Sequence, residues 1–142
     1  MISATDGPRT ASSLAEAVLE YQPGVCNIGP AEIARRRRGG HMALIATTGL
    51  YAVLVLGNAP RPARFVVALP AAAAASGYLQ ARLRFCAGFG SQGVYNFGEV
   101  GPTVAVADAE ARAQDRAKAT QIGLASLAIG VSVGLLAVLA PR

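Results

Sequence analysis

Residues 120–140, TQIGLASLAIGVSVGLLAVLA, contain no charged side chain and are rich in Leu, Ile, Val and Ala. A helix rises about 1.5 Å per residue, so this stretch would be about 31 Å long, close to the hydrocarbon thickness of a bilayer. The stretch therefore predicts a transmembrane helix. Ahead of it, Asp108 with Arg112 and Asp115 with Lys118 have helical spacings that predict ion pairs, and we expect the helix to begin near position 106.

Two other runs are apolar. Residues 41–59, HMALIATTGLYAVLVLGNA, are uncharged apart from His41 at their edge, and residues 65–81, FVVALPAAAAASGYLQA, form a shorter run after the proline-rich break PRPAR. Pro70 predicts a kink in the shorter run. The sequence therefore predicts an all-α integral membrane protein with three transmembrane helices (41–59, 65–81, 120–140), of which the first two form a hairpin.

The composition agrees with a membrane protein. Hydrophobic residues make up 53% of the chain and charged residues 15%, against roughly 25% charged residues in soluble domains. The net charge is +5, but the basic residues are not interleaved with aromatic ones, so we do not expect nucleic-acid binding. The chain divides into a cytoplasmic N-terminal segment, a helical hairpin, a cytoplasmic loop with a charged helix, and a third span with the C-terminus: 1–40, 41–81, 82–119 and 120–142.

The first apolar run is preceded by four consecutive arginines: Arg35, Arg36, Arg37 and Arg38. We expect a short helix that begins near Pro30 and ends in these arginines, with Gly39 and Gly40 separating it from the first span. A short amphipathic helix is predicted further upstream, over residues 14–21. With the N-terminus inside the cell, ten basic residues lie on the cytoplasmic side and three outside, as the positive-inside rule requires. The arginines are expected to anchor this topology and to contact lipid headgroups.

The two cysteines, Cys26 and Cys86, lack the spacing of a CxxC motif. In the predicted topology both lie near the cytoplasmic face, where the hairpin would bring them close together. The simplest interpretation is that they pack as small hydrophobic side chains. One alternative is a reactive thiol pair, favoured by the neighbouring arginines. Another is a metal site that adds His41 and Glu32, although this spacing matches zinc sites poorly.

Small residues recur every four positions in the last span and predict a helix-packing interface within or between chains: Ser126, Gly130 and Gly134. The motif GFGSQG at 88–93 resembles a dinucleotide-binding fingerprint in its spacing only, because no strand precedes it and no βαβ unit surrounds it. We expect this Gly-rich loop to dock on another chain through its glycines and the aromatic residues that follow: Gly88, Gly90, Gly93, Tyr95 and Phe97.

No predicted span carries a carboxylate, which argues against a proton or ion relay. We therefore expect a small non-catalytic accessory or assembly subunit of a larger bacterial inner-membrane complex, with its N-terminus in the cytoplasm and its C-terminus outside. Its partners would be membrane lipids and other integral membrane subunits or a second copy of the chain. The alternative is a membrane thiol-redox or metal-handling protein that uses Cys26 and Cys86 at the cytoplasmic face. The sequence identifies no cofactor.

Overall fold

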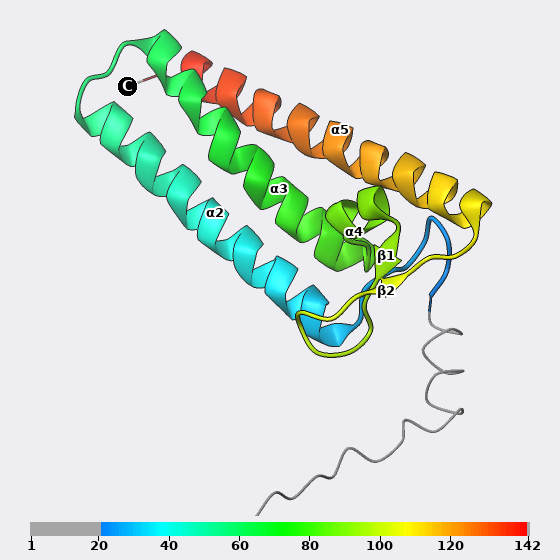
Figure 1. Cartoon of the computed structure of the whole chain (residues 1–142). Coiled ribbons are helices and arrows are strands. Elements are labelled where there is room, and N and C mark those ends of the chain that lie inside the picture. Colours follow the sequence, from blue (N-terminus) through cyan, green and yellow to red (C-terminus); the bar gives the residue numbers. More distant parts are fainter. Residues whose placement is uncertain (1–20, 142) are drawn as a thin grey trace, which may run out of the picture.

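The structure is a computed structural model and describes residues 21–141, of which helical residues make up 72% (Figure 1). Three long helices lie side by side with α3 in the middle: α2 (Pro30–Leu56), α3 (Ala68–Leu83) and α5 (Ala109–Leu139). Shorter elements gather at one end of this layer: α4 (Ala87–Gln92), β1 (Val94–Tyr95) and β2 (Val104–Ala105), the last two forming an antiparallel pair. The amphipathic helix predicted over 14–21 lies outside the described residues, apart from Tyr21.

α2 is one continuous helix of 27 residues that runs through the arginines and both glycines. The prediction of a short helix ending at the arginines is therefore wrong. A glycine inside a helix costs about 1 kcal/mol relative to alanine, but here it permits close packing. A Cβ at Gly77 of α3 would lie 2.7 Å from the Cα of Gly40, and a Cβ at Gly40 would lie 3.3 Å from the ring of Tyr78. Gly40 is thus a contact between helices, and neither Gly39 nor Gly40 breaks α2.

The second apolar run is divided between the 3-10 helix η1 (Arg61–Val67) and α3. Pro70 falls in the first turn of α3, where backbone N–H groups have no acceptor within the helix. Pro70 therefore removes no hydrogen bond of the interior of α3, which was the reason for predicting a kink. α3 has 16 residues, whereas α2 and α5 are the two described helices that are long and apolar enough to cross a membrane by length and composition. A third span over 65–81 stays a prediction.

The charged segment and the last apolar run form one uninterrupted helix, α5, of 31 residues. Asp108 is its N-cap residue, and Oδ2 of Asp108 accepts a hydrogen bond from the Ala111 N–H at 2.8 Å. Arg112 turns back and donates to the carbonyl oxygens of the two residues before Asp108, both at 2.7 Å. The predicted ion pair between Asp108 and Arg112 is therefore wrong, because the cap engages the carboxylate.

Small residues of α5 face α3. A Cβ at Gly130 would lie 2.6 Å from the carbonyl oxygen of Ala68 and 2.6 Å from Cβ of Ala72. A Cβ at Gly134 would lie 2.9 Å from Cβ of Ala68, and Ser126 is buried one turn earlier. These positions allow the two helices to approach to backbone contact.

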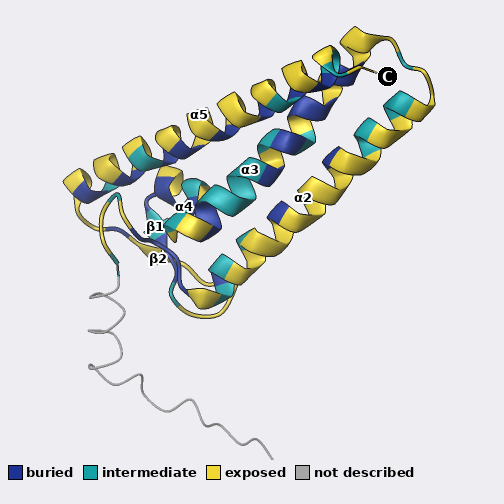
Figure 2. Cartoon of the chain, turned by 180° about the vertical axis from the view of Figure 1, so that it is seen from behind, coloured by how far each residue is buried: buried dark blue, intermediate teal, exposed yellow. Residues whose placement is uncertain are grey.

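The outward faces of α2 and α5 expose large apolar side chains (Figure 2). α5 buries a row of residues three or four positions apart, whereas only three residues of α2 are buried: Glu32, Gly40 and Thr47. Met42, Ile45 and Val53 of α2 are each 66–68% exposed. Only 11% of the most apolar part of α2 is buried, and 28% of that of α5. The core helix of a soluble protein would bury most of these side chains, so both helices lack apolar cover within the described chain.

Candidate functional site

The two cysteines lie in neighbouring loops at the end of the layer where α2 begins and α3 ends. Cys26 precedes α2, and Cys86 is the N-cap residue of α4. Both side chains are buried and both thiols are free, so no disulfide joins them. The loops meet through the residue next to Cys26.

Asn27 holds the two cysteine loops together with all its polar atoms. Its Nδ2 donates to the carbonyl of Cys86 at 3.1 Å, and its Oδ1 accepts from the N–H of Cys86 at 2.6 Å. Its backbone N–H donates to the carbonyl of Arg84, and its carbonyl accepts from the N–H of Asn96. Asn27 is fully buried, so loss of its side chain would leave the Cys86 peptide groups unpaired, at about 1–3 kcal/mol each.

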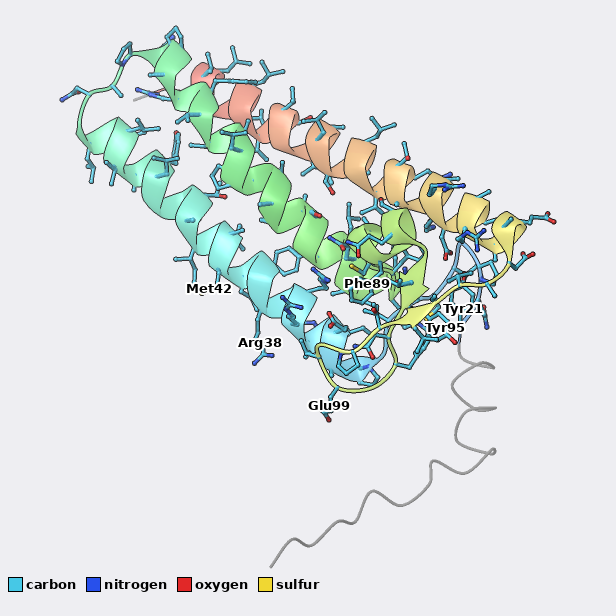
Figure 3. The ribbon with its side chains drawn as sticks, viewed as in Figure 1. Tyr21, Arg38, Met42, Phe89, Tyr95 and Glu99 are labelled. Carbon is cyan, nitrogen blue, oxygen red and sulfur yellow. The ribbon has the colours of Figure 1, made fainter. Side chains whose placement is uncertain are left out.

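The Cys86 sulfur accepts two hydrogen bonds. Nη2 of Arg36 lies 2.9 Å from Sγ, and the N–H of Phe89 lies 3.4 Å from it. The Arg36 guanidinium also lies over the Phe89 ring, 5.8 Å from its centre; Phe89 is labelled in Figure 3. Both donors interact more strongly with a thiolate, the nucleophilic form of cysteine, than with a thiol. The contacts at Cys86 therefore suit thiol chemistry, although its burial restricts access.

Glu32 places a carboxylate behind Arg36. It lies in the first turn of α2, where the helix macrodipole favours a negative charge, and it is fully buried. Its Oε2 is 3.5 Å from Nη2 of Arg36, and its Oε1 is 3.7 Å from Nη1 of Arg35. Neither oxygen accepts a hydrogen bond within the part of the chain that the structure describes. The same Arg36 nitrogen thus connects the carboxylate with the Cys86 sulfur.

Cys26 has different surroundings from Cys86. It lines a cleft of about 450 Å³, together with Ile33, Phe97 and Arg84 among others. Arg84 is exposed and ends α3 in the left-handed conformation, with φ of 53°. Cys86 does not line this cleft. The structure therefore joins the loops of the two cysteines but places one thiol at an open cleft and the other in a polar interior.

The metal alternative required His41 and Glu32 to join the cysteines. His41 instead contacts α3, where its Nδ1 lies 2.6 Å from the hydroxyl of Tyr78. Within residues 21–141, no group of three or more His, Cys, Asp or Glu side chains is placed to hold a metal ion. The described residues thus form no ligand set for that alternative.

Asp115 of α5 accepts hydrogen bonds from two of the first described residues, Tyr21 and Gly24. Its Oδ2 accepts from the Tyr21 hydroxyl at 2.6 Å, and its Oδ1 accepts from the Gly24 N–H at 2.8 Å. The predicted ion pair of Asp115 with Lys118 is wrong, because this loop already satisfies the buried carboxylate. Burial raises the pKa of Tyr21 above its ordinary value of 10.0, and the hydrogen bond to Asp115 and the negative charge raise it further. The Tyr21 ring stacks on Tyr95 at 4.7 Å (Figure 3).

The Gly-rich segment is folded against its own chain, with α4 in place of the predicted loop. A Cβ at Gly90 would lie 2.7 Å from the ring of Phe85, and Gly93 ends the helix with φ of 72°. Tyr95 is also buried, whereas Gly88 is exposed and Phe97 half-buried. Docking of this segment on another chain stays a prediction, and of the residues predicted for it only Gly88 and Phe97 are accessible on the described surface.

The arginine run points in two directions from α2. Arg35, Arg37 and Arg38 are exposed, and Arg38 extends away from the layer in Figure 3. Arg36 turns inward to Glu32 and Cys86. Arg35 is thus exposed but paired with Glu32, Arg37 and Arg38 are exposed, and Arg36 belongs to the cysteine site.

Sequence reasoning did not identify Asn27 as a site residue. Its only local signal is a polar side chain between Cys26 and Ile28, both of which are buried. The partners of Asn27 lie about sixty positions away, at Arg84 and Cys86, and no local pattern indicates them.

Comparisons with protein-family models, with curated proteins and with solved structures found no match. The chemistry of the site therefore rests on the contacts described above.

Proposed function

We propose that this chain is an integral membrane protein that acts as a small accessory or assembly subunit of a larger complex in a bacterial inner membrane. α2, η1 with α3, and α5 would all cross the bilayer, with the N-terminus in the cytoplasm and the C-terminus outside. The observation that carries the proposal is the exposed apolar surface of α2, which touches the rest of the chain along one face only. Lipid and another membrane helix would supply the missing cover.

The third span is supported by the position of α3 between its neighbours. η1 and α3 together extend over residues 61–83, long enough to cross a bilayer. The residues buried in α3 are mostly alanines that face α2 and α5. A helix covered by protein on two sides does not need strongly apolar side chains, because its neighbours shield it from lipid.

The orientation is supported by where the basic side chains lie. The start of α2, the end of α3 and the start of α5 meet at one end of the layer, and most basic residues of the described chain lie there (Figure 1). Arg61 and Arg64 lie at the other end. This asymmetry is the one that the positive-inside rule associates with the cytoplasmic face.

Two glycines allow the docking role to be tested without disturbing the fold. A Cβ at Gly49 of α2 or at Gly123 of α5 would meet nothing within 4 Å. The full-length tagged chain is extracted from native membranes in a mild detergent, and the mass of the intact assembly is measured. We expect other integral membrane chains or a second copy to co-purify. Gly49→Leu should reduce their recovery about tenfold, because overpacking a close helix contact costs about 1–3 kcal/mol.

Gly123→Leu is the matched control, with the same added volume on the other outer helix. If the partner binds to the outer face of α2, the partner should co-purify with Gly123→Leu as it does with the unchanged chain. Recovery of a lone monomer from native membranes would refute the accessory role. Loss of the partner in Gly123→Leu alone would move the docking surface to α5.

A second candidate function is thiol chemistry at the cysteine site, and the Arg36 contact with the Cys86 sulfur at 2.9 Å favours it. Replacing both Cys26 and Cys86 by serine distinguishes the candidates. Under the accessory role, assembly and cellular function are retained, whereas under the thiol role function is lost in a chain that still folds. Maleimide labelling with and without reductant shows whether the two sulfurs ever form a disulfide.

A further inference from the structure

A second cleft, of about 340 Å³, lies between α2 and α5 on the side toward η1. Thr47, Thr48 and Tyr51 line one side of it. The hydroxyls of the two threonines donate to carbonyl oxygens of α2 itself, at 2.7 and 3.0 Å, so their donors are already used. The other lining residues are apolar: Val67, Val133, Leu136, Ala137 and Ala140. The cleft is an apolar groove with a volume at the lower end of the range for ligand sites.

A buried cation is bonded to one of the residues that line this groove. Arg64 is fully buried, and its one hydrogen bond runs from Nη1 to the carbonyl of Ala140, a groove residue, at 3.2 Å. In a 3-10 helix residues three apart lie on the same face, so Arg64 shares its face with Val67, another groove residue. Nε and Nη2 of Arg64 have no hydrogen-bond partner among the described residues.

Within residues 21–141, no acidic side chain pairs with Arg64. All eight acidic residues lie at or before position 32 or between positions 99 and 115. Asp115 is about 37 Å from Ala140 along α5, and Glu32 lies in the first turn of α2, at the opposite end of the layer. A guanidinium stays charged at physiological pH, and an unpaired buried charge is costly. An anion from outside the described residues would therefore stabilise this charge.

We propose that the groove binds one anionic phospholipid, with an acyl chain between α2 and α5 and the phosphate accepting hydrogen bonds from Nε and Nη2 of Arg64. A phospholipid combines an apolar chain and a phosphate in one molecule, and the guanidinium fork matches phosphate geometry. Because Arg64 has no exposed surface, lipid binding requires a local opening that exposes Nε and Nη2, while Nη1 can keep its bond to the Ala140 carbonyl. This inference rests on the membrane insertion proposed above and is independent of the subunit role.

The absence of tryptophan from the chain permits a single fluorescent reporter in the groove. Full-length Tyr51→Trp is reconstituted in phosphatidylcholine vesicles with a small fraction of brominated phosphatidylglycerol or, in parallel, brominated phosphatidylcholine. Bromine quenches the reporter only on contact. We expect the anionic lipid to quench with about tenfold higher apparent affinity, because hydrogen bonds to charged groups strengthen the phosphate contact. Equal quenching by the two lipids would overturn the proposal.

Matched variants assign the effect to Arg64. In the reporter background, Arg64→Gln should abolish the preference, and Arg61→Gln, an exposed position of the same 3-10 helix, should keep it. Persistence of the preference in a folded Arg64→Gln chain would refute the phosphate contact. If that chain does not fold, Thr48→Phe, at an exposed groove position, should reduce quenching by filling the groove, and unchanged quenching would count against the site.

A second reporter separates this inference from the membrane proposal. Leu44 lies on α2 outside the groove and is 48% exposed. In Leu44→Trp, both brominated lipids should quench equally if α2 lies in the bilayer. Absence of quenching there would refute membrane insertion, whereas quenching there without lipid preference at Tyr51→Trp would refute the groove alone.

Discussion

Replacing Gly130 by alanine adds a methyl group where α5 touches α3. The new Cβ would lie 2.6 Å from the Ala68 carbonyl oxygen and 2.6 Å from Cβ of Ala72. Carbon atoms pack best at about 3.5–4.0 Å, so the two helices must move apart or distort. Gly123, two turns earlier on α5, is the matched control, because a Cβ there would meet nothing within 4 Å.

The difference between these variants isolates the helix contact. Both exchange glycine for alanine inside α5, so both gain about 1 kcal/mol of helix propensity. Only Gly130→Ala adds an overpacking cost, of about 1–3 kcal/mol. We expect Gly123→Ala to raise the free energy of unfolding by about 1 kcal/mol. Gly130→Ala should leave it unchanged or lower it by about 2 kcal/mol, which separates the two variants by about 1–3 kcal/mol.

The free energy of unfolding is measured by titrating dodecylmaltoside micelles with dodecyl sulfate, because such micelles retain helices and loosen tertiary contacts. Near-ultraviolet circular dichroism of the tyrosines reports the packing, and the maleimide reaction of buried Cys86 gives a second probe. If both variants stabilise the chain equally, α5 and α3 do not approach to backbone contact. The small residues of α5 would then face lipid or another chain.

Three further changes test the cysteine site and the loop that covers it, in the same unfolding assay. Asn27→Ala should lower the free energy of unfolding by about 2–6 kcal/mol, because two buried peptide groups of Cys86 lose their partners. An unchanged midpoint would contradict the role of Asn27 in joining the two cysteine loops. Arg36→Gln should lower the free energy of unfolding by about 3 kcal/mol, because it weakens the neutralisation of buried Glu32. The control Arg37→Gln, at an exposed neighbouring position, should change the free energy of unfolding by less than about 0.5 kcal/mol. Equal effects of the two variants would refute the ion pair between Arg36 and Glu32. The pKa of Tyr21 is raised in the folded chain, so the unfolded chain releases this proton first as the pH rises. The contribution of protonated Tyr21 to stability is therefore complete below the ordinary pKa of 10.0 and is lost as the pH rises above that value. Tyr21→Phe should therefore reduce the alkaline loss of stability, and an identical pH profile would exclude the contact with Asp115.

Local hydropathy predicted the apolar parts of α2 and α5 but not where α2 begins. Residues 41–59 and 120–140 largely fall within them, since helix formation in an apolar stretch depends on consecutive residues and on length. The same reasoning placed a helix end at the arginines and an ion pair at Asp108, and both were wrong. Helix ends and charge pairs depend on which partners come near in space, and within α2 the position of Gly40 packs against Gly77 of α3.

The candidate site was predictable only in part. The sequence located both cysteines near the end of the hairpin, and their loops do meet there, but it did not indicate that Asn27 joins them. Arg36 looked equivalent to its three neighbours and differs from them because its turn of α2 faces Cys86.

The sequence by itself determined a chain of apolar helices with its basic residues concentrated toward one end, because both properties are sums over neighbouring positions. Only the tertiary structure decided that Arg36 bridges a buried carboxylate and a thiol, and that Arg64 lies buried without an acidic partner. The contact of Arg36 with Cys86 joins residues 50 positions apart, and the burial of Arg64 needs the C-terminal end of α5 beside η1, so both depend on how the helices pack.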